Sequence, residues 1–132
     1  MQYDDFVEKV RERANLETRE QAEHLIEVAM VALAEPLGRE ETNRLGSQLP
    51  VELKRLLASN REEPIPAKRT MQSFQVEEYY NRVKGRLDVS YRQGVEQANA
   101  VMSVLLEAVP NSIIAGMLGD LPDGYDKFFR SS

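Results

Sequence analysis

The sequence lacks cysteine entirely and contains a single histidine among its 132 residues. The absence of cysteine excludes disulfide bonds, thiolate nucleophiles and cysteine-ligated metal or iron–sulfur sites. Because His24 stands alone, metal sites built from several histidines are excluded as well, although composition leaves a Ser–His pair open. No Gly-x-Ser-x-Gly, Gly-x-Gly-x-x-Gly or Walker motif occurs. The sequence therefore predicts no catalytic, cofactor-binding or metal-binding residue, and we expect a protein that is not an enzyme.

Long apolar runs and an excess of basic residues are also lacking. The run VAMVALA, from Val28 to Ala34, is far shorter than the ~20 residues that cross a membrane as a helix. Acidic residues number 22 against 17 Lys and Arg, and a net charge of -5 disfavours nucleic acid and anionic membranes as partners. The opening residues MQYDDFVEKV do not have the basic and then apolar order of a secretory leader. We expect a cytoplasmic protein.

The two halves of the sequence match each other at an offset of 73 residues, which shortens to 72 near their ends. The matched pairs include Phe6 with Tyr79, Val10 with Val83, Arg13 with Arg86, Arg19 with Arg92, and Leu49-Pro50 with Leu121-Pro122. Such self-similarity is the signature of a repeated structural unit. The sequence predicts repeat one at residues 3–58, a connector at 59–73 and repeat two at 74–130.

Both repeats have the pattern of amphipathic helices, since their apolar residues recur every three or four positions. Thr18 to Gln21 and Ser90 to Gln93 each have the form of a capping box, which begins a helix. About four helices are expected in each repeat. In repeat one they lie near Asp4 to Ala14, from Thr18 to a stop near Pro36-Leu37-Gly38, from Glu40 to Gln48, and from Pro50 onward. Repeat two follows the same order, with Pro110 ending its long helix and Pro122 opening its last one.

No segment shows the two-residue alternation of a strand, and the connector around Pro64-Ile65-Pro66 has no helical period. A single repeat of about 55 residues makes only a small core. We therefore expect an all-α protein in which two homologous repeats pack as one pseudo-twofold helical bundle domain over residues 1–132.

Several residues are candidates for binding a partner. Arginines recur at matched positions in the two repeats, and a pseudo-twofold arrangement would make them symmetric basic spots. The competing interpretation is that they pair within their own repeat with Glu12, Glu20, Glu23 and Glu96. Ile65 in the connector and the terminal aromatics could form a further contact surface. The candidate residues are Arg13, Arg19, Arg86, Arg92, Ile65, Phe128 and Phe129.

The segment DDFVEKVRERANL, the alanine-rich helix after it and QLPVELKRLL together resemble a bacterial family known as domain of unknown function 2267 (DUF2267). The second copy runs from EEYYNRVKGRLDV to GDLPDGYDKFF, and the two Leu-Pro steps are the most specific elements. The resemblance implies a tandem all-helical fold and brings no catalytic motif, cofactor or substrate.

These features favour a non-enzymatic module that binds another protein, with an adaptor or regulatory role, as a monomer or a homodimer. Two alternatives stay open at this point. One is the binding of nucleic acid or a phosphate ligand through the arginine spots. The other is a small-ligand binder or an enzyme with its site between the repeats.

Overall fold

The computed structural model describes residues 1–58 and 76–120, and these ranges contain six α-helices and no strand. The predicted all-α class is confirmed. None of the described helices has both the length and the apolar character that crossing a membrane requires. The connector at 59–73 and the helix expected from Pro122 lie outside the described residues. The helices are α1 (Tyr3–Arg13), α2 (Arg19–Gly46), α3 (Val51–Ala58), α4 (Val76–Leu87), α5 (Tyr91–Ala108) and α6 (Asn111–Asp120).

Both long helices begin with the predicted capping box. The Thr18 hydroxyl accepts from the backbone N–H of Gln21 at 3.1 Å, and the Gln21 side chain accepts from the backbone N–H of Thr18 at 3.3 Å. Ser90 and Gln93 repeat this arrangement at the start of α5, with distances of 3.2 and 3.4 Å. Each box satisfies backbone donors that a helix start leaves without partners. Local sequence therefore fixes where α2 and α5 begin.

The first helix of each half ends in the same way. Asn15 follows α1 and Asp88 follows α4, and each has a backbone φ of 57°, the left-handed conformation that commonly ends a helix. Asn and Asp tolerate this conformation better than most residues with a side chain. The closing hydrogen bonds run from Leu16 N to Arg11 O at 2.9 Å and from Val89 N to Lys84 O at 3.2 Å. The two left-handed residues, Asn15 and Asp88, are 73 positions apart in the sequence.

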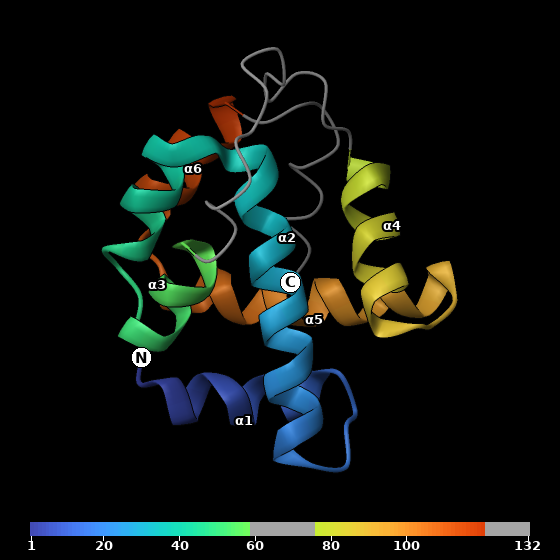
Figure 1. Cartoon of the computed structure of the whole chain (residues 1–132). Helices are drawn as coiled ribbons and strands as arrows, with labels where there is room; N and C mark the ends of the chain where they lie inside the picture. The colour runs from blue at the N-terminus through green and yellow to red at the C-terminus, as the bar shows by residue number, and fades with distance from the viewer. Residues whose placement is uncertain (59–75, 121–132) are drawn as a thin grey trace.

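Helix α2 is longer than the sequence predicts. It continues through Pro36 to Gly46, so the expected stop near Pro36-Leu37-Gly38 and the separate helix from Glu40 to Gln48 are wrong. Repeat one therefore has three helices instead of four. Figure 1 shows that the ribbon of α2 turns sharply in its C-terminal half, and the helix packs closely on α3. A proline kinks a helix without ending it when packing holds both sides, and Leu33 and Leu45 on either side of Pro36 are fully buried.

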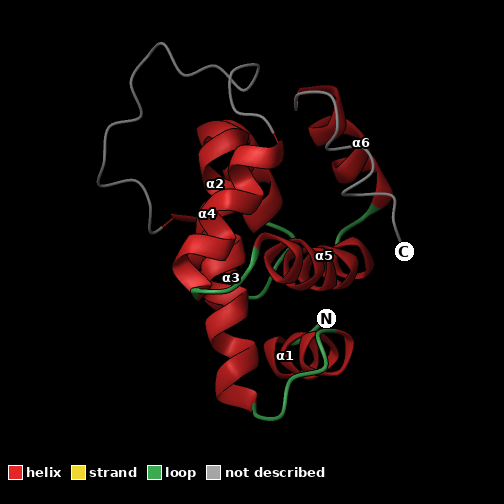
Figure 2. Ribbon diagram, turned by 90° about the vertical axis from the view of Figure 1, so that its right-hand side faces the viewer, coloured by secondary structure: helices red, strands yellow, loops and turns green. Residues whose placement is uncertain are grey.

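The core joins helices from both halves of the chain. Helix α1 packs on α2 and also on α5, while α4 packs on α5 and also on α2. Figure 2 shows α1 and α5 end-on and side by side. At the centre, the buried hydroxyl of Tyr79 on α4 donates to the carbonyl oxygen of Ala29 on α2 at 2.9 Å. One apolar cluster contains buried residues of all six helices, and its largest fully buried members are Phe6, Leu25, Ile26, Met30, Leu33, Leu45, Leu53, Leu57 and Tyr79.

Candidate functional site

A groove of about 370 Å³ lies between the end of α1, the turn that follows it and the first half of α5. Its lining combines one cation, one carboxylate and three side-chain amides with two apolar residues, and it brings together residues from both halves of the chain. The lining residues are Arg13, Ala14, Asn15, Leu16, Gln93, Glu96 and Gln97. A concave surface with several converging polar groups is the usual form of a binding site.

Local backbone structure places the side chains of this groove. Asn15 is itself the left-handed residue that follows α1. The chain turns at this residue, and the side chain of Asn15 is exposed. On α5, Glu96 and Gln97 follow Gln93 by three and four residues, which puts both on the same helix face as Gln93. Gln93 is also fixed by its capping box with Ser90. The groove is therefore built on ordered helix ends.

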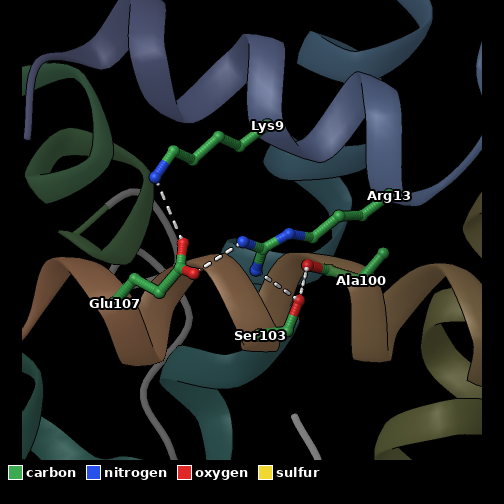
Figure 3. A network of polar contacts seen from close by, with 5 residues as sticks. All are labelled: Lys9, Arg13, Ala100, Ser103 and Glu107. Carbon is green, nitrogen blue, oxygen red and sulfur yellow. Dashed lines mark hydrogen bonds and ion pairs between the residues drawn. The ribbon is translucent and has the colours of Figure 1, made fainter.

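Arg13 lies at the centre of a polar network that ties α1 to α5 (Figure 3). Its Nη1 donates to Ser103 Oγ at 3.0 Å and its Nη2 donates to Glu107 Oε1 at 2.6 Å. Lys9, one turn earlier on α1, donates to the other oxygen of Glu107 at 3.3 Å. Ser103 in turn donates to the carbonyl oxygen of Ala100 at 2.8 Å. The hydrogen bond from Arg13 is the main cause that holds the pKa of Glu107 below its ordinary value, and Lys9 acts in the same direction.

Several donors of the groove have no partner within residues 1–58 and 76–120. A guanidinium has five N–H groups, and the two hydrogen bonds of Arg13 leave three of them open. Its side chain is 35% exposed. The side-chain amides of Asn15 and Gln97 likewise make no hydrogen bond to the described part of the chain. Glu96 accepts from Arg92 at 3.4 Å in an exposed pair on the same helix. The groove can therefore offer hydrogen bonds to a ligand.

The structure separates the arginines that the sequence singled out. Arg13 lines the groove, and Arg92 lies at its edge through its pair with Glu96. Arg19 bonds to Asp4 at 2.6 Å and to Glu23 at 2.7 Å, where α1 meets the start of α2. Arg86 is exposed in the last turn of α4. The other candidates, Ile65, Phe128 and Phe129, lie outside the described residues.

The expected pairing within each repeat holds for two of these arginines and is wrong for a third. Arg19 with Glu23 and Arg92 with Glu96 are pairs four residues apart on one helix, as expected. Arg13, in contrast, pairs with Glu107 and Ser103 of the other half. The reason is that α1 packs across α5, so the nearest carboxylate to Arg13 comes from the second repeat.

Sequence reasoning did not single out four residues of the site and its network, namely Asn15, Gln97, Ser103 and Glu107. None of them carries a chemical signature, and Ser103 and Glu107 matter only because α1 and α5 are neighbours in space. The repeat alignment could have drawn attention to Gln97, because it pairs this residue with His24, the single histidine of the sequence. His24 is exposed near the start of α2.

Comparison with protein families places most of the chain in a known family. A family model described as "Uncharacterized conserved protein (DUF2267)" matches residues 3–128. Comparison with curated proteins gives no match. Within the described residues there is no group of three or more His, Asp or Glu side chains that could hold a metal ion.

Proposed function

Because the chain belongs to the DUF2267 family, whose description assigns no activity, we propose a function from the site alone: a cytoplasmic protein-interaction module that holds a segment of a partner protein in the α1–α5 groove. Its role is that of an adaptor or regulatory protein. The single observation that carries this proposal is the set of open donors and acceptors that Arg13, Asn15 and Gln97 bring to one groove.

The lining groups match the chemistry of a polypeptide. A side-chain amide donates and accepts at once, so Asn15 and Gln97 can pair with both the N–H and the C=O groups of an extended chain. The volume of about 370 Å³ is within the ~300–1,000 Å³ that ligand sites occupy. A short stretch of a partner therefore fits the groove in size and in hydrogen-bonding capacity.

The site is held in place before any partner arrives. Ser103 and Glu107 fix Arg13, and the capping box with Ser90 fixes Gln93. Side chains that are already ordered lose less conformational entropy on binding, which favours affinity. The ordered network thus supports binding as the role of this surface.

A photo-crosslinking experiment in native cells tests the proposal. A benzophenone amino acid at position 97 lies in the groove, and the same group at position 27 lies on the exposed face of α2. We expect discrete protein adducts from position 97 that position 27 does not give.

Two further substitutions serve as a matched pair in the same experiment. Arg13→Gln should reduce the adducts, whereas Lys9→Gln should not, because both cations bond to Glu107 but only Arg13 lines the groove. Identical adducts from positions 97 and 27, or none from position 97, would contradict the proposal. A nucleic-acid mobility shift at low salt that is lost in Arg13→Gln would favour the nucleic-acid alternative instead.

A further inference from the structure

The lining of the groove carries no net charge. Among the lining residues the ionisable side chains are those of Arg13 and Glu96, one of each sign. The other polar lining residues, Asn15, Gln93 and Gln97, are amides. The lining therefore offers no excess charge that would attract a ligand of the opposite sign.

The three amides stand where the other half of the chain has ionisable side chains. The matched pairs at the offset of 73 residues are Asn15 with Asp88, Gln93 with Glu20, and Gln97 with His24. At each position a side chain whose charge depends on pH in one half is matched in the groove by an amide, which is neutral and both donates and accepts hydrogen bonds. The neutral lining is thus a property of this groove and not of the repeat.

Each amide keeps hydrogen-bonding groups for a ligand. Asn15 and Gln97 make no hydrogen bond to the described part of the chain, so each offers an NH₂ group and an oxygen. The oxygen of Gln93 accepts from the backbone N–H of Ser90 at 3.4 Å, and its NH₂ group makes no hydrogen bond within residues 1–58 and 76–120. A peptide main chain presents the complementary groups, an N–H and a C=O, at nearly every residue.

We infer that the groove takes an uncharged, extended segment of the partner and binds it mainly through its main chain, an inference that rests on the proposed function. An extended segment leaves its N–H and C=O groups free for such contacts, whereas a helix uses them internally. Its side chains alternate between two sides, so an apolar one can lie against Ala14 and Leu16 while its neighbours face away.

A charged side chain that faced the groove would meet a charge of its own sign. An acidic side chain would approach Glu96 and compete with Glu107 for the guanidinium of Arg13. A basic side chain would approach Arg13 itself. Because either charge also loses water on entering the groove, charged segments should bind less tightly than uncharged ones.

The probe is a set of four synthetic pools of short peptides with blocked ends. The first pool is randomised over Ala, Val, Ser and Thr, and the second is the same pool with alternate residues N-methylated, which removes main-chain donors and keeps the side chains. The third and fourth carry Glu or Lys at two adjacent central positions, so that one charge faces the groove whichever side of the segment binds.

Binding of the pools to the full chain is followed by nuclear magnetic resonance, because the side-chain NH₂ signals of Asn15 and Gln97 report directly from the groove. We expect the first pool to shift these signals and to bind about tenfold more tightly than each of the other three. Its affinity should be the same at low and at high salt, since no charge of the peptide takes part.

A pair of substitutions ties the result to the groove. Gln97→Met nearly keeps the length of the side chain and removes its amide. Gln2→Met makes the same change outside the groove, at an exposed residue whose side chain makes no capping hydrogen bond. We expect Gln97→Met to weaken binding of the first pool about tenfold and Gln2→Met to leave it unchanged.

Each result decides one part of the inference. Equal or tighter binding of a charged pool would overturn the preference for an uncharged segment, and equal binding of the N-methylated pool would overturn recognition of the main chain. Equal loss in both variants would overturn the assignment to the groove. If no pool shifts the signals of Asn15 and Gln97 while position 97 still crosslinks to a protein, the inference fails and the proposed function survives.

Discussion

Two glycines in the second half of the chain should respond in opposite ways to the same substitution. A Cβ atom added to Gly94 would lie 2.8 Å from the Cβ of Lys84, 3.1 Å from its Cα and 3.3 Å from its backbone nitrogen. A Cβ atom added to Gly85 would meet nothing within 4 Å. Helix α4 therefore crosses α5 at Gly94 without space for a side chain, whereas Gly85 faces an open surface.

The size of both effects follows from general values for helix preference and overpacking. Alanine favours a helix over glycine by about 1 kcal/mol, so Gly85→Ala should raise the free energy of unfolding by about that amount. Gly94→Ala gains the same preference but must move the backbone of Lys84, and overpacking of this kind costs ~1–3 kcal/mol. Because backbone atoms cannot rotate away, we take the upper part of that range. Gly94→Ala should then lose about 1–2 kcal/mol.

Urea unfolding followed by circular dichroism measures both values, and thermal unfolding gives an independent check at about 3–5 °C per kcal/mol. The unsubstituted chain and Gly85→Ala serve as controls for the general effect of alanine in a helix. If Gly94→Ala stabilised the protein as much as Gly85→Ala does, the close crossing of α4 and α5 at Gly94 would be refuted.

Three further predictions concern single contacts. Tyr79→Phe should lower the free energy of unfolding by about 0.5–1.5 kcal/mol in urea, because it removes the buried hydrogen bond to Ala29; no change would refute a role for that bond. Ser90→Ala should cost about 1 kcal/mol, measured in the same way, because the backbone N–H of Gln93 loses its acceptor. The pKa of Glu107 in the folded state is lower than its ordinary value of about 4.5. Its ion pairs therefore stabilise the fold at a pH above that ordinary value, and this stabilisation is lost as the pH falls through the folded-state pKa. Glu107→Gln should therefore weaken the loss of stability on acidification, and an unchanged acid limb in a pH series would contradict this.

Local sequence signals predicted most of the helices because they act over only a few residues. The hydroxyl of Thr18, the turn at Asn15 and the inward spacing of Leu53 and Leu57 need no knowledge of the rest of the fold. The passage of α2 through Pro36 could not be predicted in this way. Burial on both sides of the proline outweighs its local preference, and that burial exists only in the assembled core.

One apparent departure from the repeat pattern is explained by a pair of residues. Asn99 stands where the first half has Ile26, and the structure shows that the hydroxyl of Tyr80 donates to the side-chain oxygen of Asn99 at 2.9 Å. Tyr80 itself stands where the first half has Val7. An apolar pair has thus been replaced by a hydrogen-bonded pair. Burial is the main cause that raises the pKa of Tyr80 to about 12.

The groove was beyond prediction for a geometric reason. Its two walls come from residues about 80 positions apart, such as Arg13 and Gln93, and no motif links them. Sequence identified Arg13 by its charge and Gln93 by its capping role, but it could not bring them together. Only the packing of α1 on α5 does so.

The pairing of Arg13 on α1 with residues of α5 has a consequence for the order in which the newly made chain can fold. On the ribosome, α1 and α2 emerge first, but the surface that α1 needs is completed only when Ser103 and Glu107 of α5 have been synthesised. Contacts that close such long loops slow folding relative to other all-helical proteins of this size. Until then α1 lacks its contact with α5, and this nascent stage is when the chain is most open to chaperones and to aggregation.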